Sequence, residues 1–138
     1  MTPDAIDQAV QTYFHANWTA TPAFYENLPT PSTMPAQYVT CTVLLGRGFK
    51  KELGKSGLGK RVGVVKFQIF TPAGCGGRVG KALGGQIETL FRGTDLDEGI
   101  YFGPDGDGDD EPYTVNSGND GTYQQHTTTC PFWTWTGK

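Results

Sequence analysis

Cysteine, histidine and long apolar runs are scarce in this sequence of 138 residues, and each scarcity excludes a class of protein. The three cysteines, Cys41, Cys75 and Cys130, lie far apart without a CxxC pair. They therefore predict neither a disulfide framework nor a zinc site, and they fit a reducing compartment. No stretch approaches the roughly 18 apolar residues that a membrane span requires. The first residues lack the basic and apolar regions of a signal peptide, so we expect neither secretion nor a membrane partner.

Neither sign of charge predominates strongly in the sequence. The chain has 11 Lys and Arg against 14 Asp and Glu, a net charge of −3. A mildly acidic chain is not a general binder of polyanions, so any contact with nucleic acid would need a local basic patch. Glycine, with 20 residues, is about twice as frequent as its usual ~7%. The length suits one domain, and we expect residues 1–138 to form it.

The N-terminal half reads as a helix followed by a hairpin. Thr2 is a suitable cap, Pro3 suits the first helical position, and apolar residues from Ile6 to Trp18 then recur at helical spacing. Residues 21–35 contain four prolines and predict an irregular connection. Residues 37–45 and 61–70 read as two strands, which should pair antiparallel because nothing between them could form a crossover helix.

The C-terminal half predicts a second helix and then short strands. Residues 78–91 carry one apolar stripe, although Gly84 and Gly85 inside it each cost about 1 kcal/mol unless the backbone approaches a neighbour closely. Strands are expected at residues 99–103, 113–117, 121–129 and 132–136, with a hairpin turn at 119–121. Pro131 should start the last strand or place it at an edge. The order predicts an α+β fold: a mainly antiparallel sheet, two helices on one face and a long hairpin loop.

Two segments imitate ligand-binding loops. Residues 54–60, GKSGLGK, match the first seven positions of a phosphate-binding P-loop, but Arg61 replaces the hydroxyl residue and a strand follows instead of a helix. Residues 105–111, DGDGDDE, place Asp at the first, third and fifth positions of a calcium loop. Asp110 then stands where the turn glycine belongs, and Asn116 where the bidentate glutamate belongs. A small phosphate- or calcium-binding module remains the alternative from a different functional class.

Catalytic signatures are missing. The only histidines are His15, in the first helix, and His126, in a polar strand. Neither lies in a local nucleophile motif, so we expect no enzyme, no catalytic residue and no cofactor.

The candidate interaction surface combines a basic cluster with an aromatic chain end. Six of the eleven basic residues lie within fifteen positions of the hairpin, where they either keep a loop soluble or dock on an acidic or phosphate surface. Trp133 and Trp135 point to the same side of the last strand and predict either a core strand or a subunit contact. The candidate surface residues are Arg47, Lys50, Lys51, Lys55, Lys60, Arg61, Trp133 and Trp135.

Several segments of the chain are informative in their order and spacing. A short amphipathic helix is followed by AFYENLP at residues 23–29, and Tyr38 and Val39 open a strand. QIFTPAGCG at residues 68–76 precedes the second helix, and CPFW at residues 130–133 opens the last strand. Together these segments resemble the tail terminator (tail completion) proteins of long-tailed bacteriophages, the lambda-type minor tail protein family.

The resemblance implies a structural protein of the virion, assembled in the host cytoplasm. It implies a homohexameric ring at the tail–neck junction that binds the tail tube protein, ends tube polymerisation and presents a face to the head–tail connector, with DNA passing through its lumen. Another head–tail joining or minor tail protein is the alternative within the same class.

Overall fold

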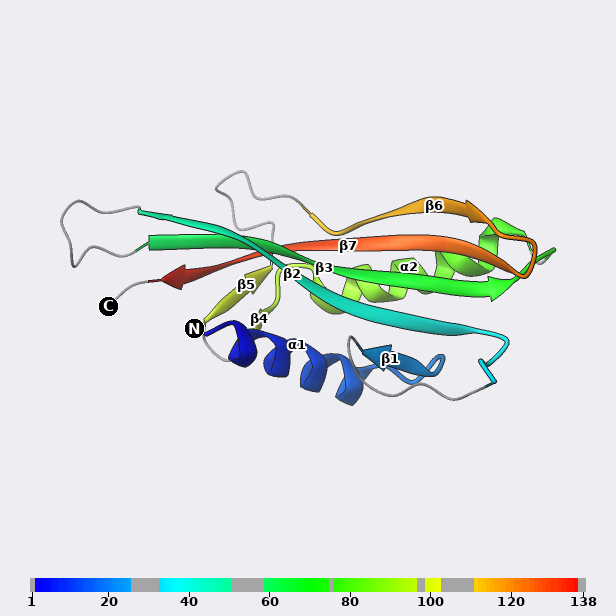
Figure 1. Ribbon diagram of the computed structural model, residues 1–138, viewed down its shortest axis with the longest axis horizontal. Coiled ribbons are helices and arrows are strands. Elements are labelled where there is room, and N and C mark those ends of the chain that lie inside the picture. The colour runs from blue at the N-terminus through cyan, green and yellow to red at the C-terminus, as the bar shows by residue number, and fades with distance from the viewer. Residues whose placement is uncertain are drawn as a thin grey trace.

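A computed structural model describes residues 2–25, 33–50, 59–74, 76–96, 99–102 and 111–136, with the backbone alone described at 47–50 and 136. The described chain has an α+β fold, as predicted (Figure 1). Its elements are α1 (Pro3–Asn17), β1 (Ala23–Tyr25), β2 (Tyr38–Lys50), β3 (Gly59–Pro72), α2 (Gly77–Phe91), β4 (Asp95–Leu96), β5 (Ile100–Phe102), β6 (Tyr113–Asn119) and β7 (Tyr123–Thr136). Neither helix is long and apolar enough to cross a membrane.

Both helices start and end close to the predicted positions. The Thr2 hydroxyl oxygen accepts a hydrogen bond from the Ala5 amide at 3.4 Å, and Pro3 occupies the first turn, where a missing amide proton costs nothing. On α2 the predicted apolar stripe is buried at Leu83, Ile87 and Phe91. These signals are local, which is why the sequence alone reveals them.

The sheet is mostly antiparallel, with the strand order β1-β2-β3-β7-β5-β4 and with β6 paired to β7. The predicted β2–β3 hairpin is confirmed, and both strands are longer than expected. Within the connection predicted to be irregular, β1 instead pairs parallel to β2. This three-residue strand lies between proline-rich flanks, so propensity alone could not identify it.

Strand β7 corrects the expectation of two separate strands. It runs unbroken through Pro131, which pairs with Val64 of β3 in the interior of the sheet. On its other edge, β7 pairs with β6 up to Thr129 and with β5 from Phe132 onward. Pro131 therefore falls between the two partner strands, where the ladder on that edge requires no donor.

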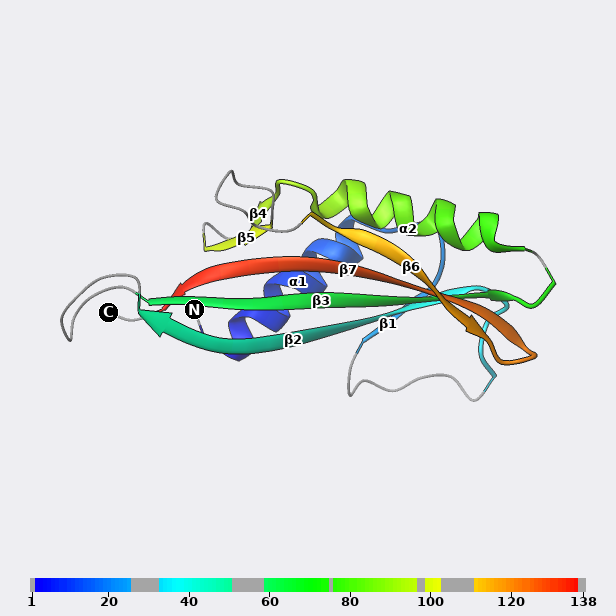
Figure 2. The same ribbon diagram turned by 90° about the horizontal axis from the view of Figure 1, so that it is seen from above.

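Alternation along the strands defines a covered face and an uncovered face of the sheet. On β3, Val65, Phe67 and Ile69 are fully buried against the helices, whereas Lys66 and Gln68 point away and are exposed. Both helices contribute to the same core, so they cover the same face, as predicted. Figure 2 looks onto the opposite face, with α1 passing behind the strands. We call this opposite side the uncovered face.

Small residues let α2 lie close to the sheet. A Cβ at Gly80 would lie 2.2 Å from Nδ1 of His126, and one at Gly84 would lie 2.6 Å from the Thr114 side chain. Gly84 thus has the close approach expected from the sequence. Nothing lies within 4 Å of a Cβ at Gly85, so the structure does not explain that glycine.

His126 lies beneath the first turns of α2 and is fully buried. The sequence places it in a polar strand, but its parity on β7 turns it into the core, opposite Ile69 of β3. Neither ring nitrogen has a hydrogen-bond partner within the described chain. Such a ring is stable only in its neutral form, because burying an unpaired charge is costly.

The free energy of unfolding should therefore fall as the pH is lowered from about 7 to about 5. Burial, with a smaller contribution from the charge of Lys81, lowers the pKa of His126 below its usual value of 6.5. The unfolded chain then binds the proton more readily, so stability is lost as the pH falls below about 6.5. The pKa values of Asp4 and Asp120 are lowered, so these carboxyls titrate only at more acidic pH. Urea titrations at about pH 7 and about pH 5 measure this fall in the free energy of unfolding. The fall should be smaller in His126→Gln than in wild type, and an equal fall would mean that His126 is not the group responsible.

Candidate interaction face

The uncovered face carries all the large hydrophobic side chains that the described chain leaves exposed. Leu44 and Val62 are 46% and 41% exposed, and Tyr113 and Val115 are each 49% exposed. Trp135 is 38% exposed and belongs to the same face, because it pairs with Lys60. Large apolar residues gathered on one side of a folded chain are typical of a surface that binds protein.

One end of this face is an aromatic cluster around Trp133. The Tyr101 ring stacks on Trp133 with centroids 4.5 Å apart, and the Trp135 ring meets it edge-on at 5.0 Å. Nζ of Lys60 lies 4.6 Å from the centroid of Trp133. Trp133 and Trp135 do share a side of the strand, while Phe132 and Thr134 are buried on the other.

The basic cluster expected at the hairpin divides in the structure. Arg61 lies in β3, as predicted, but Lys60 lies there too rather than in the hairpin loop, and the two point to opposite faces of the sheet. Lys60 is only 8% exposed, so it is not a solvated loop residue as expected. Arg47 and Lys50 lie in β2 with only their backbone described, and Lys51 and Lys55 lie outside the described residues.

The middle of the uncovered face is polar. A shallow depression of about 240 Å³ is lined by Thr40, Thr42, Lys66, Gln68 and Thr127. The Gln68 amide donates to the Gln125 side-chain oxygen at 3.3 Å across β3 and β7. Several aromatic side chains and little charge are features of protein interfaces, although on this face the apolar residues surround a polar centre.

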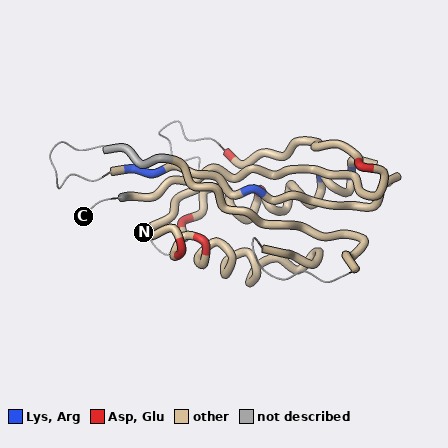
Figure 3. The backbone as a smooth tube through the Cα atoms, in the orientation of Figure 1, with Lys and Arg blue, Asp and Glu red and all other residues tan. Residues whose placement is uncertain are grey.

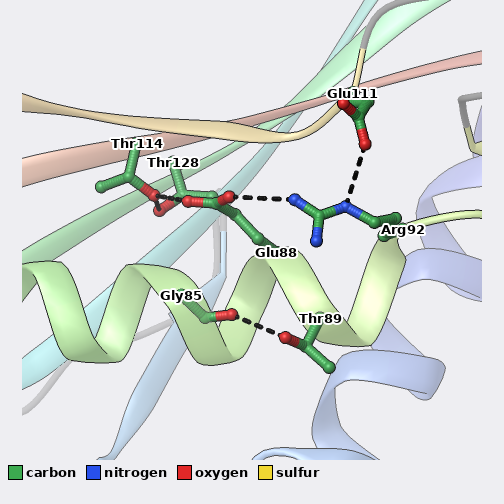
Figure 4. A network of polar contacts seen from close by, with 7 residues as sticks. All are labelled: Gly85, Glu88, Thr89, Arg92, Glu111, Thr114 and Thr128. Atoms are coloured by element: carbon green, nitrogen blue, oxygen red, sulfur yellow. Dashed lines mark hydrogen bonds and ion pairs between the residues drawn. The ribbon is translucent and has the colours of Figure 1, made fainter.

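A polar network fixes β6, and with it Tyr113 and Val115, in place (Figure 4). The Thr114 hydroxyl donates to the Glu88 carboxylate of α2 at 2.6 Å and lies 2.8 Å from the Thr128 hydroxyl. Arg92 contacts Glu88 at 3.4 Å and Glu111 at 3.3 Å. Only the Glu88–Arg92 pair, four residues apart on one helix, could have been found from the sequence.

The residues considered for catalysis do not come together. His126 has no hydrogen-bond partner among the residues that the structure describes, and His15 lies exposed at the end of α1. Burial raises the pKa of the Cys130 thiol, which disfavours a reactive thiolate. Within the described ranges, no three His, Cys, Asp or Glu residues are grouped as metal ligands would be. Strand β3 begins at Gly59, so a strand and not a helix follows the P-loop-like segment, as predicted. Residues 54–58 of that segment, and all of the calcium-like segment except Glu111, lie outside the described residues.

The geometry defines the class of protein as a small α+β fold with one sheet face that the described helices leave uncovered. Seven solved chains match this fold. One of them, which carries no descriptive name, aligns at 14% identity with a TM-score of 0.63, covering 100% of this chain and 96% of its own. No curated protein matches the sequence. The family model described as phage tail terminator protein matches residues 5–107, about three quarters of the chain.

The chain belongs to the phage tail terminator family. The match runs from α1 to just beyond β5, so it includes both helices and the β2–β3 hairpin. A structural role in the phage tail follows from this membership. The resemblance stated from the sequence is thereby confirmed for the family as a whole.

Proposed function

We propose that this chain caps the phage tail tube as a homohexameric ring, ends tube polymerisation and forms the interface to the head–neck connector. The observation that carries the proposal is the uncovered face, where Leu44, Val62, Tyr113, Val115 and Trp135 remain exposed in a single copy. A cap on a tube of stacked rings has to close on itself, and closure requires a subunit surface of this kind.

Shape and not chemistry is the proposed basis of this role, so we propose no catalytic step and no cofactor. The subunit is part of the virion at the tail–neck junction, and DNA passes through the ring. The basic residues of the hairpin, Arg47, Lys50, Lys51 and Lys55, are proposed to serve the same assembly surfaces as Lys60, Arg61, Trp133 and Trp135. Charges at the rim of an interface tune the rate and specificity of assembly more than its affinity.

Two measurements test the ring and its role. The purified chain, at 15.0 kDa per copy, should have a solution mass of about 90 kDa by light scattering and native mass spectrometry, as six copies require. Virions assembled without this protein should contain tail tubes of uncontrolled length under the electron microscope. A stable monomer that binds ATP or calcium would favour the small binding module instead. Tubes of normal length in its absence would exclude the capping role.

A further inference from the structure

We propose that the uncovered face of one copy receives helix α1 of the next copy, so that the ring closes by a head-to-tail contact between sheet and helix. This inference rests on the proposed ring and adds which two surfaces meet in it. The occupant of the uncovered face is thus a second copy of this chain, presenting the outer side of α1.

The size of the uncovered face fits a subunit contact. Strands β2, β3 and β7 have 13, 14 and 14 residues, and β6 has 7. At roughly 3.3 Å per residue and about 4.8 Å between strands, the flat projection of these four strands is about 760 Å². A stable, specific interface buries about 800 Å² on each partner. One such contact would therefore use most of this face.

The charges in the middle of the uncovered face disfavour a symmetric pairing of two such faces. The described side chains that point outward from β2, β3, β6 and β7 include two cations, Lys60 and Lys66, whereas the carboxylates of Asp95 and Asp120 lie at the margins of the face. Two copies joined sheet to sheet would bring like charges together. A head-to-tail contact avoids this repulsion, and with a suitable rotation it closes into a ring.

Helix α1 offers the complementary charge. Within Pro3–Asn17 the charged residues are Asp4 and Asp7, without Lys or Arg. Figure 3 shows these acidic positions on the helical layer and the basic positions on β3. Opposite charge on the two sides of the subunit is the pattern expected where one copy faces the next.

The flank of α1 beside β4 also has a fitting shape. A groove of about 580 Å³ runs along the helix, where Ala5, Ala9 and Ala16 leave room and Leu96 of β4 forms part of the wall. Figure 1 shows α1 beginning at the end of the molecule where β7 finishes, the end that carries Trp135. A half-exposed tryptophan entering a groove lined by small side chains is a typical anchor of a protein interface.

The test reverses the charge of one face at a time. A sheet variant carries Leu44→Glu and Lys66→Glu, and a helix variant carries Asp4→Lys and Asp7→Lys; all four side chains are at least partly exposed. Alone, each variant should be monomeric where wild type is hexameric, with subunit association weakened at least tenfold at about 50 mM salt and less at about 500 mM. Lys81→Glu, on the outer side of α2, is a charge-reversal control outside both faces and should assemble like wild type.

Mixing the two variants is the decisive measurement. The normal sheet of the helix variant can bind the normal α1 of the sheet variant, and the two altered faces are again complementary. Native mass spectrometry should therefore show rings with three copies of each variant. This rescue also demonstrates that both variants are folded. If the hexamer persists in the helix variant, or the mixture remains monomeric, the contact proposed here is wrong while the ring stands. A monomeric wild type overturns both.

Discussion

Replacing Gly80 by alanine is expected to lower the free energy of unfolding by about 2–3 kcal/mol. The new Cβ would lie 2.2 Å from Nδ1 of His126 and 2.6 Å from its Cε1. The His126 ring is fully buried between α2 and the β7 backbone, so the clash can be relieved only if α2 moves outward. Alanine favours a helix over glycine by only about 1 kcal/mol, which is less than the cost of the clash. Urea unfolding followed by circular dichroism measures the difference.

Two other glycines of the same helix provide controls. Gly84→Ala should cost less than Gly80→Ala, because its nearest neighbour is the smaller Thr114 side chain. Gly85→Ala should stabilise the protein by up to about 1 kcal/mol, since the new methyl group meets nothing within 4 Å. In a double variant, His126→Ala should cost less in the Gly80→Ala background than in wild type. If all three glycine substitutions stabilise the protein alike, α2 does not pack as closely as described.

The sequence predicts those parts of the fold whose causes are local. The Thr2 cap, the apolar stripe of α2 and the turn at residues 119–121 each depend on residues within one or two turns of one another. In that turn, Asp120 accepts hydrogen bonds from the amides of Thr122 and Tyr123, and Gly121 has a φ of +92°. These interactions need no tertiary context, so pattern and composition suffice to find them.

The features that the sequence does not predict depend on distant neighbours. His126 is buried because of its parity on β7 and because Gly77 and Gly80 approach it from another element. Pro131 is tolerated inside a strand because β6 and β5 leave a gap at that position. Propensity describes a residue in its own segment and carries no information on either arrangement.

The candidate surface shows the same division. The shared side of Trp133 and Trp135 follows from strand alternation and was predictable. The position of Lys60 over the Trp133 ring depends on the pairing of β3 with β7, which the sequence does not reveal. The exposure of Tyr113 and Val115 on this face likewise depends on the pairing of β6 with β7. A cluster of charges in the sequence therefore did not identify the uncovered face, which is defined mainly by aromatic and aliphatic residues.

Phe91→Ala should cost about 3–5 kcal/mol, a large part of the stability of a chain this size. The Phe91 ring contacts Tyr13 of α1 at 5.3 Å, Phe67 of β3 at 5.2 Å and Phe102 of β5 at 4.9 Å between centroids. One truncation thus removes the contact that joins both helices to the sheet. Thermal unfolding should show a decrease of roughly 10–20 °C in the midpoint.

Phe70→Ala is the matched control, because the same group is removed from the half-buried uncovered face, where Phe70 stacks on Tyr38 at 4.4 Å. Phe70→Ala should lower the free energy of unfolding of the single chain by less than half as much as Phe91→Ala. Because the proposed ring would bind only folded copies, the midpoint of Phe91→Ala should rise with protein concentration. Similar costs for the two variants would mean that the core is not organised around Phe91. A concentration-independent midpoint would mean that the folded copies do not associate.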